Sequence, residues 1–295
     1  MPQKDKIKKI IKWIIAVSIY YSGALSLYRR FFKKWFVPNN IIILRYHRVL
    51  NNEKKDAINI SVHMRSLEKQ LLYMKRFFNI MSIPRIVEGL SRNHIFSKPT
   101  VGITFDDGYK DNYICAFPLL KKYNAPATIF LTVGHIDNNI PFPWDAPETA
   151  NSDAEDIAIL SWDDIYKMND DLISFGSHTI SHPKLSSTSA EKVYDELVGS
   201  RRVLSGAVTN YVDLFSYPFG DFNEQTKDCV KRAGYKAAFT TRDGFCKRVN
   251  DLFLIKRKAI HENLVKNPFG RFSKSLFALE IEGLMDLLLP SRSYL

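Results

Sequence analysis

The chain has 295 residues, of which 45% are hydrophobic and 25% charged. This ordinary globular composition excludes a fibrous or disordered protein, and the length fits one large domain or two modest ones. The net charge is +11, and residues 1–40 hold nine lysines and arginines against one acidic residue. Because a nucleic-acid-binding protein usually spreads its basic residues over the folded body, we expect no nucleic-acid partner.

The chain begins with a basic segment that surrounds an apolar run. Residues 13–28 are sixteen uncharged residues, rich in aromatics, between Lys12 and Arg29. A spanning helix needs about 20 apolar residues, so the run favours a helix lying in a membrane interface, with a single-pass anchor as the alternative. A cleaved signal peptide is the weakest of the membrane-related interpretations, since no Ala-x-Ala-like site follows the run. A buried helix of the folded domain is a further alternative, against which the basic flanks argue. We expect residues 1–34 to bind an anionic membrane surface.

Strand and helix patterns alternate after residue 40. Strands are predicted over residues 41–46, 101–105, 127–133, 172–175, 212–215, 237–240 and 252–260. Helices are predicted over residues 61–78, 109–123, 161–168, 188–204, 223–233 and 272–289, with a capping box at Thr188 and Glu191. The alternation predicts a parallel α/β sheet, open or closed into a barrel. Its chemistry is expected at the carboxyl ends of the strands.

Two adjacent carboxylates, Asp106 and Asp107, follow the strand over residues 101–105. A divalent ion needs an anionic ligand, and hydrolysis needs a base beside the attacking water, so the pair can divide these two functions. The alternative is a turn that caps a helix.

His178 and His182 follow the strand over residues 172–175. Imidazoles four residues apart can chelate one metal ion, and Pro183 favours a loop over a helix between them. The alternative is two surface histidines. Combined with the carboxylate pair, the histidines predict an open catalytic site of two imidazoles, one carboxylate and a water.

A third strand ends in the sequence FSYPFG, residues 215–220. Pro218 and Gly220 favour an exposed turn whose backbone N–H groups can stabilise an oxyanion. An ordinary turn between a strand and a helix explains the same residues equally well.

The motifs TFDDG, HTISH and FSYPFG, in this order, resemble the polysaccharide deacetylase family, carbohydrate esterase family four. The opening residues 43–49, ILRYHRV, resemble the start of its bacterial branch, and the resemblance covers residues 41–262. It implies a distorted (β/α)7 barrel and a hydrolase that removes N-acetyl groups from an amino sugar in a polysaccharide or lipid-linked glycan. The alternatives are an O-acetyl or formyl sugar hydrolase and a degenerate, non-catalytic carbohydrate-binding protein.

The resemblance also implies roles for individual residues. Asp106 would be the catalytic base, while Asp107, His178 and His182 would bind a divalent metal. Zinc is expected, with cobalt, nickel or manganese as alternatives. Phe219 stands where the family usually has a tyrosine whose backbone N–H is an oxyanion donor.

Two positions depart from the family pattern. Ser216 stands where the family often has an arginine that pairs with an aspartate, and Arg257 is a candidate to supply this guanidinium instead. His261 is the candidate general acid, and His47, at the end of the first strand, is a lesser one. Tyr217 is grouped with Phe219 and Arg257 as a candidate contact for the substrate or oxyanion.

Three parts are therefore expected along the chain. Residues 1–40 form the membrane-associating segment with its helix, residues 41–265 the catalytic domain, and residues 266–295 an amphipathic helix packed on or beside the barrel. The expected location is the bacterial inner membrane, peripheral or single-pass. The cytoplasmic side is slightly favoured, because the three cysteines have no disulfide-like spacing.

Overall fold

The computed structural model describes residues 3–36, 41–51, 58–138, 140–145, 157–246 and 251–288. Its strands are β1 (Ile41–Tyr46), β2 (Arg48–Leu50), β3 (Ser61–His63), β4 (Asn79–Ile80), β5 (Thr100–Phe105), β6 (Ala127–Leu131), β7 (Ile173–Ser177), β8 (Tyr211–Ser216), β9 (Ala237–Phe239) and β10 (Lys258–Ala259). Its α-helices are α1 (Gln3–Tyr21), α2 (Ala24–Leu27), α3 (Lys33–Phe36), α4 (Met64–Phe77), α5 (Ile83–Ser91), α6 (Phe117–Tyr123), α8 (Trp162–Met168), α9 (Ala190–Ala207), α10 (Glu224–Arg232), α11 (Glu262–Val265), α12 (Lys274–Glu282) and α13 (Leu284–Leu288).

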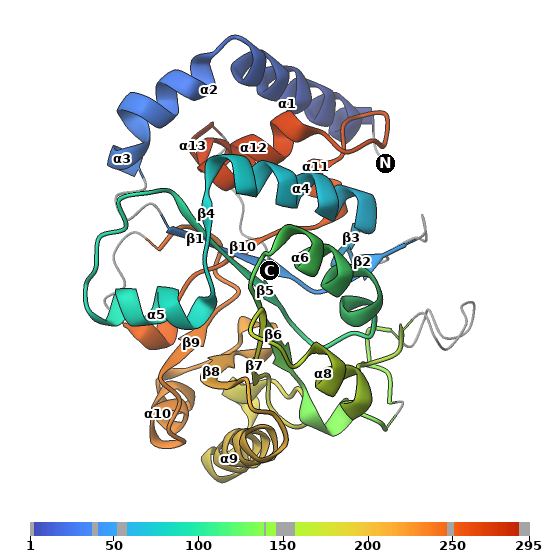
Figure 1. The fold of residues 1–295 in the computed structure, drawn as a ribbon, viewed down its shortest axis with the longest axis vertical. Coiled ribbons are helices and arrows are strands. Elements are labelled where there is room, and N and C mark those ends of the chain that lie inside the picture. Colours follow the sequence, from blue (N-terminus) through green and yellow to red (C-terminus); the bar gives the residue numbers. More distant parts are fainter. Residues whose placement is uncertain are drawn as a thin grey trace.

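A curled parallel sheet forms the centre of the molecule, and helices lie around its outside (Figure 1). The strand order is β10-β1-β5-β6-β7-β8-β9, with β4 beside β5. Residues 255–259 link the two ends of the curl, because Ile255 bridges to β9 and Lys258 pairs with β1. The predicted parallel α/β sheet is confirmed. Since parallel strands share one direction, the residues that follow β1, β5, β7 and β8 meet at one rim.

Buried apolar residues explain why these segments become central strands. All six residues of β5 are buried, and so are all five of β6, as expected for strands covered on both faces. The helix predicted over residues 161–168 is confirmed as α8, and Ser161 and Asp164 exchange hydrogen bonds in a capping box at its start.

Several element boundaries differ from the sequence predictions. The strand predicted over residues 252–260 is wrong in its first half. Residues Leu252–Leu254 form a 3-10 turn because the Asp251 carboxylate accepts the Phe253 N–H, so only β10 remains as strand. Thr188 is not a helix cap; the next residue, Ser189, caps α9 instead. The helix expected over residues 272–289 is broken into α12 and α13 at Gly283, which has φ 81°.

The N-terminal helix α1 packs along α12 (Figure 1). The apolar run is not one continuous helix, because Gly23 has φ 84° and ends it. Within the described residues, no single helix is long and apolar enough to cross a membrane. The bent pair Lys6–Tyr21 and Ala24–Phe32, with 68° between its halves, meets the length and composition requirement only when taken together.

Ion pairs with buried carboxylates hold the N-terminal segment in place. Lys12 Nζ lies 3.0 Å from Glu280 Oε1, and Glu282 binds Arg29 Nε and Lys33 Nζ at 2.7 Å each. Both glutamates are buried on α12. Three of the nine basic residues that we expected to face a membrane therefore bind the folded domain instead.

Candidate active site and metal centre

The carboxylate pair lies on a sharp turn after β5. Asp107 has φ 72° and Gly108 has φ 79°. This conformation favours glycine at position 108, and a Cβ there would lie 2.8 Å from Leu131 Cδ2, so the Leu131 side chain would have to shift. Neighbouring residues of an extended strand point to opposite faces. The turn removes this restriction, and both carboxylates are buried at the same site.

The two histidines lie on an irregular loop after β7. Thr179 and His182 have φ values of 71° and 57°, and the Thr179 hydroxyl accepts the His182 N–H at 3.0 Å. Glu196 of α9 accepts two further N–H groups of this loop. The loop predicted from Pro183 is therefore held in one conformation by its own side chains and by α9.

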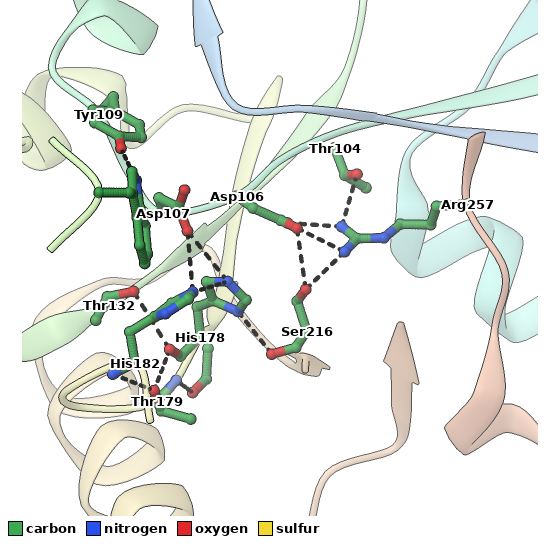
Figure 2. A network of polar contacts seen from close by, with 12 residues as sticks. Thr104, Asp106, Asp107, Tyr109, Thr132, His178, Thr179, His182, Ser216 and Arg257 are labelled. Atoms are coloured by element: carbon green, nitrogen blue, oxygen red, sulfur yellow. Dashed lines mark hydrogen bonds and ion pairs between the residues drawn. The ribbon is translucent and has the colours of Figure 1, made fainter. Parts of the chain in front are cut away.

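Asp107, His178 and His182 form a compact group of ligand atoms (Figure 2). Asp107 Oδ1 lies 3.3 Å from His178 Nε2 and 3.4 Å from His182 Nε2, and the two Nε2 atoms are 3.2 Å apart. Ligands of a tetrahedral ion with bonds of about 2.0 Å stand about 3.3 Å from one another. The donor types and their spacing therefore fit one divalent ion.

Neighbouring groups orient the first imidazole. His178 Nδ1 donates to the Ser216 carbonyl at 2.7 Å, which fixes the ring so that Nε2 faces Asp107. Burial raises the pKa of Asp107. Hydrogen bonds from both histidines outweigh this effect and hold the pKa well below its usual value. Within the described residues, the buried His182 Nδ1 has no hydrogen-bond partner.

Arg257 holds the other carboxylate. Its Nη1 and Nη2 donate to Asp106 Oδ1 and Oδ2, both at 2.7 Å (Figure 2). Thr104 and Ser216 complete the group, since Nη1 also donates to Thr104 Oγ1 and Nη2 to Ser216 Oγ. Arg257 has no exposed surface. A bidentate pair of this kind fixes both the position and the plane of the carboxylate.

The guanidinium also sets the charge of Asp106. Burial alone raises the pKa of this carboxyl group, but the positive charge of Arg257, with a smaller contribution from His178, lowers it to about 2. Asp106 is consequently ionised at neutral pH, and its position beside the cluster of Asp107 and the histidines suits a proton acceptor.

A pocket of about 250 Å³ opens above these residues. Besides the polar cluster, an aromatic and apolar wall lines it: Ile58, Ile60, Trp144, Tyr217 and Phe219. Trp144 packs against the rings of His182 and Phe219, with centroids 4.9 and 5.4 Å away. Such a wall suits the apolar face of a sugar and a methyl group.

Two side chains fix the orientation of Trp144. Its Nε1 donates to the Tyr109 hydroxyl at 2.9 Å, and that hydroxyl donates to Asp145 Oδ2 at 2.8 Å. Sequence reasoning missed Trp144 and Tyr109. The only available signal was a tryptophan between prolines and an aspartate in a loop, which does not indicate which strand end it approaches.

The structure separates the candidates for the general acid. His47 lines the pocket, whereas His261 immediately precedes α11 and is not among the lining residues. Burial lowers the pKa of His47 to about 4, against the opposing effect of Asp107 and Asp106. Tyr217 and Phe219 both line the pocket, and Phe219 has φ 56° with nearly half of its surface exposed.

Comparison with known proteins supports the resemblance. Residues 94–238 match the family model described as polysaccharide deacetylase. YxkH of Bacillus subtilis, which is named for the same family, is 29% identical over 61% of this chain, and the match spans 58% of its own length. The poly-beta-1,6-N-acetyl-D-glucosamine N-deacetylase of Staphylococcus aureus is 26% identical over 80% of this chain and 84% of that protein. The solved structure of the Streptococcus pyogenes deacetylase PplD in complex with acetate has a TM-score of 0.64 at 27% identity. It covers 78% of this chain and 95% of that one.

Proposed function

We propose that the chain is a metal-dependent hydrolase that removes N-acetyl groups from an amino sugar, because residues 94–238 match the polysaccharide deacetylase family model. The observation that carries this proposal is that one buried site holds two carboxylates with different partners. Asp107 points at two imidazoles, and Asp106 is held ionised by Arg257. Binding a sugar needs neither arrangement.

Each carboxylate has its own task in the reaction. Asp106 accepts the proton of the attacking water, and Arg257 keeps it deprotonated and correctly aimed. Asp107, His178 and His182 would hold a divalent ion, zinc for preference, which supplies Lewis acidity toward the amide oxygen and acidifies the water. The backbone N–H of Phe219 is the proposed second oxyanion donor.

We assign the protonation of the departing amine to His47 in place of His261, since His47 lines the pocket and His261 does not. His47 is neutral in the free protein at neutral pH, given its pKa of about 4. The negative charge that develops on the tetrahedral intermediate beside it would favour its protonated form. The leaving sugar amine then takes the proton, and acetate and a free amino sugar result.

The substrate class follows from the pocket and the relatives. The aromatic wall around Trp144 favours a sugar ring, and the Staphylococcus aureus relative is named for a β-1,6-linked N-acetylglucosamine polymer. We propose an N-acetylated polysaccharide or lipid-linked glycan as the substrate. The same site could remove O-acetyl or formyl groups, and a non-catalytic carbohydrate-binding protein is the other alternative.

The proposal includes a location and a domain organisation. Residues 1–34 would attach the enzyme to a membrane surface, residues 41–265 would form the catalytic domain as a distorted (β/α)7 barrel, and residues 266–295 would pack on it. The support is the exposed isoleucine face of α1, formed by Ile7, Ile11, Ile14 and Ile15. The bacterial inner membrane, with the cytoplasmic side preferred, is the proposed site of action.

An assay for released acetate tests this function. We expect release from N-acetylated oligosaccharides, its loss with a chelator and its return on adding zinc. Release from O-acetylated sugars alone would favour the esterase alternative. Sugar binding without any release would favour the non-catalytic one.

A further inference from the structure

A second groove, separate from the catalytic pocket, lies between α1, α4 and the segment leading into α12. It encloses about 670 Å³. Trp13, Val17 and Tyr21 of α1 line one side, and Lys69, Leu72, Tyr73 and Arg76 of α4 line the other. We call it the basic groove. It shares no lining residue with the catalytic pocket, so the proposed reaction does not use it.

Three cations surround the basic groove, and no carboxylate lines it. Lys69, Arg76 and Lys274 all have exposed side chains. None of the three has an ion-pair partner in the part of the chain that the structure describes. The acidic residue of α4, Glu68, accepts hydrogen bonds from Lys122 and Tyr123 instead. The groove therefore carries uncompensated positive charge suited to an anionic group.

Aromatic rings place the ammonium groups at the groove. Lys69 Nζ lies 5.8 Å from the ring centroid of Phe272, and Lys274 Nζ lies 5.9 Å from that of Tyr20. Contacts of this kind hold a cation against an apolar surface without neutralising it. A basic rim over an aromatic floor matches the boundary between lipid headgroups and acyl chains.

The basic groove is continuous with the isoleucine face of α1. Tyr21 lines the groove and is 74% exposed. It lies two helical turns after Ile14 and four after Ile7, and therefore on the same side of α1 as these isoleucines. Leu72, on the opposite wall, is 51% exposed. If the isoleucine face enters a membrane interface, the groove on the flank of the same helix lies at the level of the headgroups.

We propose that the basic groove binds the anionic headgroup of a bilayer phospholipid through Lys69, Arg76 and Lys274. The inference rests on the proposed membrane attachment of residues 1–34 and adds a specific site whose cations lie outside that segment. The basic residues of residues 1–34 would already favour anionic leaflets, and the groove adds a further contribution to this preference at one defined site.

Flotation of the full chain with vesicles tests the site. The vesicles contain phosphatidylcholine alone or mixed with phosphatidylglycerol. The triple variant Lys69→Gln/Arg76→Gln/Lys274→Gln is compared with a control that removes the same charge from three exposed residues elsewhere, Arg85→Gln/Lys98→Gln/Lys192→Gln. We expect the groove variant to lose about tenfold or more of its preference for anionic vesicles, because each basic residue near the surface contributes about fivefold. The control should retain its preference within about twofold.

Acetate release from a soluble oligosaccharide and the unfolding temperature report that each variant is folded. Equal losses in both triple variants would overturn the groove, since general charge would then explain binding. Equal binding of wild type to neutral and anionic vesicles would overturn it while leaving membrane attachment intact. Absence of wild-type binding to either vesicle would overturn both, with the catalytic proposal untouched.

Discussion

Arg257 binds both carboxylate oxygens of Asp106, although 151 residues separate them in the chain and β1 lies between β5 and β10 in the sheet. The guanidinium therefore reaches from the start of β10 to the end of β5. In the family pattern that the sequence resembles, the corresponding arginine stands at the position of Ser216. Here Ser216 donates its hydroxyl hydrogen to Asp106 and accepts a bond from Arg257. The carboxylate of Asp106 is thus still paired with a guanidinium, but this guanidinium comes from position 257 and not from position 216.

The first prediction concerns the base. Asp106→Asn should lower kcat by about a hundredfold or more, because the proton acceptor is lost. Its metal content, measured by mass spectrometry, should be unchanged, since Asp107 and the histidines are retained. Asp107→Asn is the matched control and should lose metal as well as activity. Equal metal loss in both variants would mean that the two aspartates share the ligand role.

The second prediction concerns Arg257. In Arg257→Met, only the smaller effects of His178 and His47 would oppose burial, so the pKa of Asp106 would rise and the carboxyl group would protonate at higher pH. The acidic limb of the kcat/KM profile should therefore move toward neutral pH. A buried unpaired carboxylate also lowers the free energy of unfolding by about 3 to 5 kcal/mol. Chemical denaturation measures this loss.

A double variant tests whether the guanidinium beside Asp106 can come from position 216 instead of position 257. Ser216→Arg/Arg257→Ser moves the guanidinium to the end of β8, where the Ser216 Oγ atom now lies 2.8 Å from Arg257 Nη2. We expect it to restore the acidic limb toward that of the wild type, compared with Arg257→Ser alone. If the single and double variants share one pH profile, the guanidinium does not act through the pKa of Asp106.

The third prediction separates the two histidines. His47→Gln should lower kcat by about a hundredfold, because the leaving amine loses its proton donor. His261→Gln should retain kcat within about threefold, since this residue does not line the pocket. A substrate with a good leaving group should rescue His47→Gln and leave the other variant unchanged. The reverse ranking of the two variants would return the acid role to His261.

The ligand residues could be predicted from the sequence because each of them follows a recognisable strand. Asp107, His178 and His182 each come within a few residues of an apolar strand, so their meeting could be inferred from parallel topology alone. Arg257 was placed only as a candidate. Its environment depends on how the segment after Asp251 leaves the sheet, and that segment turns where a strand was expected. The aromatic wall of the pocket includes Trp144, which lies in a loop. A loop has no repeating hydrophobic pattern from which its path could be predicted.

The N-terminal segment shows a different limit of sequence reasoning. Its basic residues indicated a membrane, yet Lys12, Arg29 and Lys33 pair with glutamates about 250 residues away. Charge patterns along one segment do not reveal a partner on a distant helix. The glutamates themselves lie in an apolar sequence around Ile281, where they could be read as the polar face of an amphipathic helix. They are instead buried counter-charges.

The fourth prediction tests this packing. Glu282→Gln should lower the free energy of unfolding by about 3 to 5 kcal/mol, because Arg29 and the buried Lys33 lose their partner. The exposed pair of Glu88 and Arg92 provides the control. Glu88→Gln should change stability by less than about 0.5 kcal/mol. Similar effects of the two substitutions would show that α1–α3 contribute little to the folded state.

The fifth prediction concerns the mode of membrane attachment. If α1 lies in the interface, carbonate or high salt should release part of the protein from membranes, since charge and a shallow apolar face hold it. If the bent pair Lys6–Tyr21 and Ala24–Phe32 spans, only detergent should release it. A chain that remains wholly in the supernatant, with residues 1–34 shown intact by mass spectrometry, would refute both forms.

The packing of α1 on α12 has a consequence for the order of folding. The bond between Lys12 and Glu280 closes a loop of 268 residues, so α1 is synthesised long before its partner helix exists. At a synthesis rate of about 5 to 20 residues per second, the face of α1 with Trp13 and Ala16 has no partner for roughly 10 to 50 s. If residues 1–34 attach to a membrane as proposed, a lipid surface offers α1 an apolar environment during that time. We therefore expect α1 to reach the membrane before the sheet is complete, and the contacts between α1 and α12 to form there.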